Sequence, residues 1–311
     1  MSVTSSVIPE PPASSETRMA YVLLLAAPAM FATNYLVARV CVALIPPFTL
    51  ALLRWGITAV LAGMLAGPLL RANVGAARAE WRDLLLLGAI GMALCGASAY
   101  AAAQTTVAVN IGLIYAASPA LIAVLARYLF NERLAPVQMA GMAACLIGVL
   151  WIIGRGDPRS LLRLNFVTGD LWAVLGAIGW AVYSVLLKQR PGRLPPQVRF
   201  VWLCAAGALV VLPFSVWELA WEQPRVTPHW TPQAAGYVTL LVVVASLGAY
   251  QAYDKVQRVL GAARAGIIMY VGPVYAAFLA WGLLGEPLHV FHAVGAALVL
   301  GGVYAVNRRA K

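Results

Sequence analysis

Ten apolar stretches, each close to the length needed to cross a lipid bilayer, follow one another along this chain of 311 residues. A membrane-spanning helix needs about 20 predominantly apolar residues, and backbone in lipid must satisfy its hydrogen bonds internally. The pattern therefore predicts an all-α polytopic membrane protein with ten transmembrane helices. The expected spans are residues 20–43, 47–70, 83–104, 107–127, 135–154, 169–190, 197–219, 233–255, 262–283 and 288–307.

The composition agrees with a membrane protein and excludes most soluble classes. Apolar residues make up 62% of the chain and charged residues 11%, whereas soluble domains carry about 25% charged residues. No Gly-rich phosphate loop, Ser-His-Asp set or HExxH motif is present, so we expect no enzyme, cofactor or metal site. The four cysteines lie in or at the ends of apolar runs without CxxC spacing, and we expect them to pack as small apolar residues: Cys41, Cys95, Cys145 and Cys204.

The basic residues predict the orientation of the chain. With ten spans, 16 of the 22 Lys and Arg residues fall on the side of the two termini and five on the other side, while Arg54 lies within a span. Because Lys and Arg accumulate in cytoplasmic loops, both termini are expected in the cytoplasm and the protein in the inner (cell) membrane. This distribution explains the net charge of +11 without a nucleic-acid partner.

The second half of the chain repeats the first. A shift of 154 residues matches Pro, Glu and Gly positions, namely Pro119 with Pro273, Glu132 with Glu286, Gly141 with Gly295 and Gly148 with Gly302. We expect a disordered cytoplasmic tail (1–19), a first repeat (20–154), an extracytoplasmic linker (155–168), a second repeat (169–308) and a cytoplasmic C-terminus (309–311). Five spans per repeat is an odd number, which inverts the second repeat and favours an alternating-access transporter over a scaffold.

The duplicated segments resemble the EamA family of the drug/metabolite transporter superfamily. They read SPALIAVLARYLFNERLAPVQMAGMAACLIGVL and GPVYAAFLAWGLLGEPLHVFHAVGAALVLGGVY, and the resemblance covers residues 20–308. It implies a secondary transporter that exports small, partly apolar metabolites, with amino acids, especially aromatic ones, as the favoured substrates. Other metabolites such as nucleotide sugars or drugs, and a non-transporting membrane scaffold, remain alternatives.

Polar and aromatic side chains within the spans are candidates for a central cavity. Their polar atoms need partners in the membrane, so they point inward, either to a ligand or to other helices. The candidate substrate-binding residues are Asn34, Tyr35, Tyr100, Gln104, Tyr115, Ser118, Trp180, Tyr183, Tyr250, Tyr253, Met269 and Tyr270. The repeat-matched Pro119 and Pro273 are expected to act as hinges, and the matched Tyr100 and Tyr253 as gates near opposite mouths of the pathway.

Charged residues and histidines in the apolar runs have less specific interpretations. We expect Arg54 to snorkel toward the outer surface, with attraction of a substrate carboxylate as the alternative. Glu132 and Glu286 precede the starts of two spans and are expected to be structural, stabilised by a helix dipole. His289 and His292 share one helix face without a carboxylate or thiol and are also expected to be structural.

No carboxylate lies in the middle of a span, so the sequence predicts facilitated transport that needs no proton gradient. The alternative is that Asp254, near the cytoplasmic end of its span, titrates in a wet cavity. The expected partners are a small-molecule substrate and the lipid bilayer, and the expected state is a monomer or a weak homodimer.

The predicted topology is tested by labelling. A single cysteine placed in the loop of residues 188–199 should react with a membrane-impermeant maleimide only from the cytoplasmic side, because that loop joins two inward-ending spans. Labelling of this loop from outside intact cells would contradict the predicted orientation.

Overall fold

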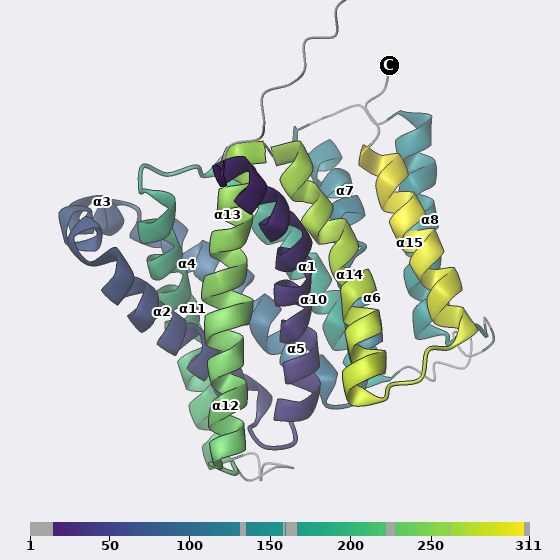
Figure 1. The fold of residues 1–311 in the computed structure, drawn as a ribbon, viewed down its shortest axis with the longest axis horizontal. Helices are drawn as coiled ribbons and strands as arrows, with labels where there is room; N and C mark the ends of the chain where they lie inside the picture. The colour runs from purple at the N-terminus through teal and green to yellow at the C-terminus, as the bar shows by residue number, and fades with distance from the viewer. Residues whose placement is uncertain are drawn as a thin grey trace, which may run out of the picture.

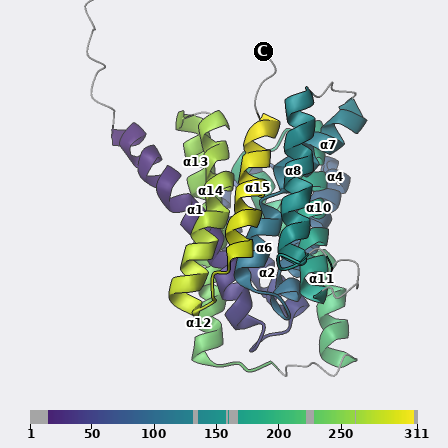
Figure 2. The same cartoon turned by 90° about the vertical axis from the view of Figure 1, so that its right-hand side faces the viewer.

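The computed structural model describes residues 15–130, 135–157, 159, 167–221, 228–260 and 262–307. The regular secondary structure in these ranges is helical, and the helices run side by side in one bundle (Figure 1 and Figure 2). In chain order the α-helices and the two π-helices (η) are α1 (Ser15–Cys41), α2 (Pro47–Ala72), α3 (Val74–Ala79), α4 (Trp81–Gly88), η1 (Ala89–Leu94), α5 (Cys95–Ala103), α6 (Ala108–Tyr115), α7 (Ser118–Phe130), α8 (Pro136–Ile153), α10 (Thr168–Gln189), α11 (Pro196–Ala220), α12 (Pro232–Leu240), η2 (Leu241–Gly248), α13 (Ala249–Leu260), α14 (Ala262–Leu284) and α15 (Val290–Asn307).

Eight helical runs in the described ranges are long and apolar enough to cross a bilayer, which makes the chain a multi-pass membrane protein. Three of these runs are composite: the first joins α4, η1 and α5, the second joins α6 and the first part of α7, and the third joins α12, η2 and α13. Two shorter apolar helical stretches, Val271–Leu284 and Val290–Ala305, coincide with the last two expected spans. Helix α1 begins at Ser15, so residues 15–19 are helical and differ from the expected disordered tail.

Proline sets the start of several helices. Pro47, Pro136, Pro196 and Pro232 each occupy the first helical position, where the missing N–H group is not needed and the fixed φ angle suits a helix. Proline also marks a kink within α2, where Pro68 follows a residue with non-helical backbone angles.

The repeat-matched prolines occur in different local structures. Pro119 is the second residue of α7, directly after a break that separates α6 from α7 within the fourth apolar run. Pro273 instead lies inside the continuous helix α14. At equivalent positions of the sequence repeat, the helix is therefore interrupted in the first half of the chain and continuous in the second half.

Two pairs of helices pack antiparallel through small residues. Gly148 of α8 contacts Val299 of α15, and Gly302 of α15 contacts Cys145 of α8. Residues later in one helix thus meet residues earlier in the other. Helices α2 and α11 are also antiparallel, because Gly56 approaches Ala208 and Gly63, later in α2, approaches Val201, earlier in α11. Glycine and alanine at these positions allow the two backbones to come close, as is usual between helices in membranes.

The start of α1 and the end of α15 lie at the same end of the bundle (Figure 1 and Figure 2). We call the opposite end, where α1 ends and α15 begins, the distal end. There Arg39 of α1 donates a hydrogen bond to the carbonyl of Ala103 at the end of α5 (2.8 Å) and lies 3.9 Å from the carboxylate of Glu286. The distal end is therefore tied together by polar contacts between elements far apart in the sequence.

The α8–α15 contact predicts a difference between two adjacent glycines. A Cβ atom at Gly302 would lie 2.7 Å from Cys145 Sγ, whereas one at Gly301 would have no neighbour within 4 Å. Gly302→Ala should lower the stability of the purified protein by about 1–3 kcal/mol, as overpacking does. Gly301→Ala should be neutral or slightly stabilising, because alanine favours a helix. Equal thermal midpoints for the two variants in detergent would contradict this interface.

Candidate functional site

The side chain of Arg54 lies inside the bundle, about two turns into α2, and is 5% exposed. Its Nε donates a hydrogen bond to Ser246 Oγ (2.8 Å), and one terminal nitrogen donates to Asn34 Oδ1 (2.7 Å) and to Tyr100 Oη (3.0 Å). The other terminal nitrogen reaches the carbonyl oxygen of Ala245 at 3.3 Å. The expectation that Arg54 snorkels outward is wrong, because α1, α5 and η2 surround this face of α2. We call Asn34, Arg54, Tyr100 and Ser246 the Arg54 cluster.

The partners of Arg54 are dipoles and not charges. Asn34, Tyr100, Ser246 and the Ala245 carbonyl are all neutral acceptors. The ion pairs between described residues include those of Arg39 with Glu286, Arg190 with Asp83 and Arg258 with Asp254, and Arg54 takes part in none of them. Arg54 therefore carries a positive charge that is removed from water and has no acidic partner among the described residues, an arrangement that is normally expensive.

A π-helix supplies two of the Arg54 contacts. Ser246 and Ala245 both belong to η2, which interrupts the run between α12 and α13. A π-helical segment widens the turn locally, and such segments are frequent at functional sites. Here η2 presents both a side-chain hydroxyl and a backbone carbonyl to the same guanidinium group.

Aromatic rings from several helices lie close to the Arg54 cluster. Trp55 stacks under the guanidinium, with 4.2 Å between Arg54 Cζ and the ring centroid. Tyr35 and Tyr115 pack against the buried group of residues that contains Tyr100. Tyr250 packs against the buried group that contains Trp55. The rings of Tyr35 and Tyr115 pack together with their centroids 5.7 Å apart. The cluster is thus a polar centre with aromatic walls.

Glycines make room for these rings. A Cβ atom on Gly91 of η1 would collide with the ring of Tyr183, and one on Gly176 of α10 would collide with the hydroxyl of Tyr115. The Tyr115 hydroxyl passes α10 to donate a hydrogen bond to the carbonyl of Cys95 (2.9 Å). The absence of a side chain at Gly91 and Gly176 is therefore what admits Tyr183 and Tyr115 to the interior.

The structure brings together many of the expected binding residues. Asn34 and Tyr100 contact Arg54 directly, and Tyr35 packs on Tyr115. Trp180 packs on Tyr183 with 5.4 Å between ring centroids, while Tyr250 and Tyr253 both pack on Phe31, at 5.6 and 6.5 Å.

The remaining expected residues lie elsewhere. Ser118 donates a hydrogen bond to the carbonyl of Ala177 (3.4 Å) and so joins α7 to α10. Gln104 is exposed beyond the end of α5 and does not share the environment of Tyr100. Tyr100, expected near a mouth of the pathway, is fully buried beside Arg54. The side chains of Met269 and Tyr270 lie outside the described part of the structure.

Sequence reasoning missed the way acidic groups close the distal end. Glu286 accepts hydrogen bonds from the backbone N–H groups of Ala108 (3.1 Å) and Val109 (3.4 Å), so it caps α6 and not the helix that follows it in sequence. Glu218 likewise accepts from the N–H groups of Phe48 and Thr49 at the start of α2. Glu132, the repeat partner of Glu286, is outside the described residues. These caps join segments that are distant in sequence, so no local sequence pattern predicts them.

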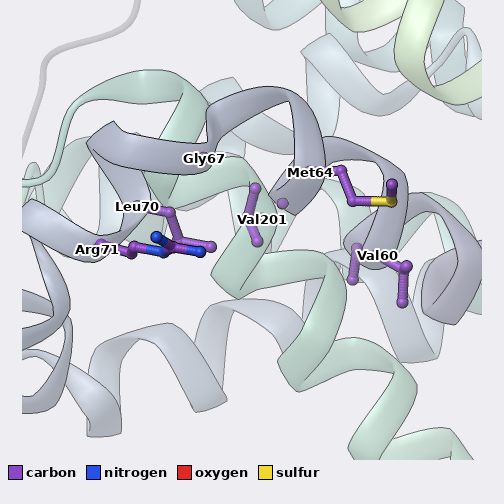
Figure 3. Close-up of a pocket in the computed structure, with 8 residues that line it drawn as sticks. Val60, Met64, Gly67, Leu70, Arg71 and Val201 are labelled. Carbon is purple, nitrogen blue, oxygen red and sulfur yellow. The ribbon is translucent and has the colours of Figure 1, made fainter.

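A separate cavity of about 620 Å³ opens on the outside of the bundle between α2 and α11 (Figure 3). Its lining is apolar except for Arg71 and consists of Ala59, Val60, Gly63, Met64, Gly67, Leu70, Arg71 and Val201. Val60 and Met64 are largely exposed, so the cavity opens toward the surroundings of the bundle and not toward the Arg54 cluster.

Comparison with known proteins identifies the family to which this chain is similar. The sequence pattern of the EamA-like transporter family matches residues 18–154 and again residues 167–308. The chain is 25% identical over 291 residues to the uncharacterized transporter YyaM of Bacillus subtilis, with 92% of this chain and 93% of that protein covered. A solved crystal structure shares the fold with a TM-score of 0.60 at 23% identity, covering 94% of this chain and 96% of that one.

Two further relatives carry names that state a substrate. One, from Streptantibioticus cattleyicolor, is named a probable terminal-alkyne amino-acid exporter and is 27% identical over 277 residues, 84% of each chain. The other is the aromatic amino acid exporter YddG of Ancylobacter novellus, 26% identical over 239 residues, which cover 76% of this chain and 78% of that protein.

The Tyr100 hydroxyl is expected to stabilise the Arg54 cluster, because it accepts from Arg54 and donates to Asn34 Oδ1 at 3.1 Å. Tyr100→Phe should lower the stability of the purified protein by about 1.5–3 kcal/mol, the range for a hydrogen bond to a charged group. Thr58→Val is the matched control on α2. The buried Thr58 hydroxyl has no hydrogen-bond partner among the described residues, so its loss should be neutral or stabilising. A thermal midpoint of Tyr100→Phe at or above that of Thr58→Val would contradict the cluster.

Proposed function

The chain belongs to the EamA-like transporter family, and on this premise we propose that it exports amino acids, preferably aromatic ones, by alternating access through the Arg54 cluster. The observation that carries this proposal is the buried guanidinium of Arg54, which has no acidic partner among the described residues. A substrate carboxylate supplies the missing negative charge. Arg54 is thus the binding group for the part that all amino acids share.

The neutral partners of Arg54 suit such an exchange. Guanidinium groups bind carboxylates with two parallel hydrogen bonds, and these charge-assisted bonds are stronger than bonds to neutral acceptors. When Arg54 turns to a substrate, Asn34 and Tyr100 keep each other as partners, since the Tyr100 hydroxyl already donates to Asn34 Oδ1. Substrate binding therefore leaves no buried polar group of this pair unsatisfied.

The aromatic side chains around the Arg54 cluster suit the ring and the ammonium group of an aromatic amino acid. Tyr35, Tyr115, Trp180, Tyr183 and Tyr250 offer ring faces for stacking and for contact with the substrate ammonium group. Two relatives are named as exporters of amino acids, which supports the same substrate class. Nucleotide sugars fit less well, because Arg54 is the one buried Lys or Arg side chain in the part of the chain that the structure describes.

We propose ten membrane-spanning helices in two inverted repeats, residues 20–154 and 169–308. Antiparallel packing supports this arrangement, because α2 and α11, and likewise α8 and α15, occupy matching positions in the two repeats. The two π-helices also match: a shift of 153 residues places η1 (Ala89–Leu94) within η2 (Leu241–Gly248). A parallel duplication would place equivalent helices in the same direction.

The proposed transporter has a defined orientation in the membrane and residues that act as hinges and gates. Both termini lie in the cytoplasm and the distal end faces outward across the inner membrane, with residues 155–168 as an extracytoplasmic linker. The charge asymmetry and the shared end of α1 and α15 support this orientation. Pro119 and Pro273 serve as hinges and Tyr253 as a gate, whereas Tyr100, buried beside Arg54, gates the pathway at its centre and not at a mouth. The protein is a carrier without catalytic activity and works as a monomer or weak homodimer.

Efflux from proteoliposomes tests the proposed function. Vesicles loaded with radiolabelled tryptophan should lose it through the wild-type protein, and an anionic sugar nucleotide should be retained. Tryptamine, which lacks the carboxylate, should be transported poorly. Arg54→Gln should slow tryptophan efflux by about 30-fold or more, because loss of one partner of a buried charge pair costs about 2–5 kcal/mol.

Two variants control for folding and for general charge effects. Arg54→Lys keeps the buried positive charge and should retain part of the efflux. Arg71→Gln removes an exposed arginine from the same helix and should transport tryptophan as the wild type does. The proposal fails if folded Arg54→Gln transports tryptophan at the wild-type rate, or if the wild type does not distinguish tryptophan from the sugar nucleotide.

A further inference from the structure

Three acidic side chains are buried at the distal end: Asp170, Glu218 and Glu286. Glu218 and Glu286 each accept backbone hydrogen bonds on both carboxylate oxygens at a helix N-terminus. Such bonds stabilise an ionised carboxylate. Asp170 differs, because both hydrogen bonds that it accepts end on Oδ1, from Thr106 Oγ1 (2.5 Å) and Asn110 Nδ2 (3.3 Å). Asp170 Oδ2 is buried and has no hydrogen-bond partner among the residues that the structure describes.

The surroundings of Asp170 join both halves of the chain. Thr106 lies just before α6, and Asn110 lies in its first turn. Asp170 lies in the first turn of α10, and His292 lies in the first turn of α15. His292 Nδ1 accepts from the N–H of His289 (3.1 Å), so its Nε2 carries the proton and donates to Asn110 Oδ1 at 3.1 Å. This contact turns the Asn110 amide nitrogen toward Asp170.

Among the described residues, the charged groups around this network leave Asp170 without a direct counterion. Arg155, at the end of α8, acts on Asp170 electrostatically but is itself exposed. Arg39 pairs with Glu286, whose carboxylate accepts hydrogen bonds from the start of α6. His292 in the first turn of α15 and His289 just before that helix are the histidines near the network. Exposed charges are screened by solvent, so Arg155 compensates a fully buried carboxylate only weakly.

We propose that Asp170 is a proton-binding site: it holds a proton while the distal end is closed and releases it to the extracytoplasmic side when that end opens. The physical reason is the difference in hydration between the two states. An ionised carboxylate with one oxygen lacking any donor is costly in a closed interior, whereas water entering the open state can solvate both oxygens. This inference rests on the proposed alternating access and on the outward position of the distal end.

The sign of the pH effect follows from proton linkage. The closed state binds one proton more than the open state, so a rise in pH shifts the equilibrium toward the open state. The ratio of open to closed protein changes by up to tenfold for each pH unit in the range where the two states differ by a full proton. Extracytoplasmic acid therefore keeps the outer gate shut.

Infrared difference spectroscopy tests the proton itself without any substrate. The purified protein at neutral pH should show the carbonyl stretching band of a protonated carboxyl group, and Asp170→Asn should remove it. Asp254→Asn is the matched control and should leave the band in place, since Asp254 is paired with Arg258 at 2.9 Å. A wild-type spectrum without this band, or a band that persists in Asp170→Asn, would overturn the proposal.

Tryptophan exchange in proteoliposomes held at equal internal and external pH tests the linkage. Wild-type exchange should rise by about tenfold or more between pH 5.5 and pH 8, and the Asp254→Asn control should do the same. Asp170→Asn stays neutral at every pH, so its exchange should be slow and should vary less than twofold. Thr106→Val removes one donor to the carboxylate and should move the rise to higher pH.

The outcomes separate this inference from the proposed function. Loss of the pH dependence in His292→Gln together with its retention in Asp170→Asn would assign the titration to the histidine and overturn the proposal. Rapid tryptophan exchange that is independent of pH in the wild type would also overturn it, while leaving amino-acid transport intact. Absence of tryptophan transport would refute the proposed function, and the infrared result would still decide whether Asp170 holds a proton.

Discussion

A positive charge held in the interior by neutral dipoles is the constraint on which the architecture depends. Arg54 is desolvated, so α1, α5 and η2 must each bring an oxygen atom to it, and Trp55 must cover it. The π-helical turn of η2 and the close approach of α5 to α2 serve this arrangement. Dipoles solvate a cation less completely than a carboxylate does. The same group that holds the helices together therefore remains ready to bind an anion.

Negative charge is placed at the distal end, away from Arg54. Glu218 and Glu286 neutralise helix N-termini there and connect segments from opposite halves of the chain. Helix starts expose N–H groups that must be satisfied inside a membrane, so these carboxylates stabilise a closed distal end. Asp170 occupies the same layer without equivalent donors. The closed end thus combines two fixed caps with one group whose charge depends on hydration.

The helices were predictable because length and hydropathy decide what can cross a bilayer. The repeat was visible in Pro119 and Pro273 and in the paired glycines of α8 and α15. The Arg54 cluster was not predictable, because its partners lie 20, 46 and 192 residues away in sequence and meet only through helix packing. The cap of α6 by Glu286 was not predictable for the same reason, because Glu286 is far from α6 in sequence. Tyr100 was correctly chosen as an interior residue, but its place at the centre follows from Arg54, whose burial the sequence did not reveal.

A structure of the protein determined with tryptophan bound tests the central claim most directly, because it locates the substrate carboxylate. The account predicts both carboxylate oxygens within hydrogen-bonding distance of the Arg54 guanidinium, with Asn34 and Tyr100 bonded to each other and the indole ring among the surrounding tyrosines. Tryptophan bound elsewhere, with Arg54 still held by Asn34, Tyr100 and Ser246 alone, would contradict the account.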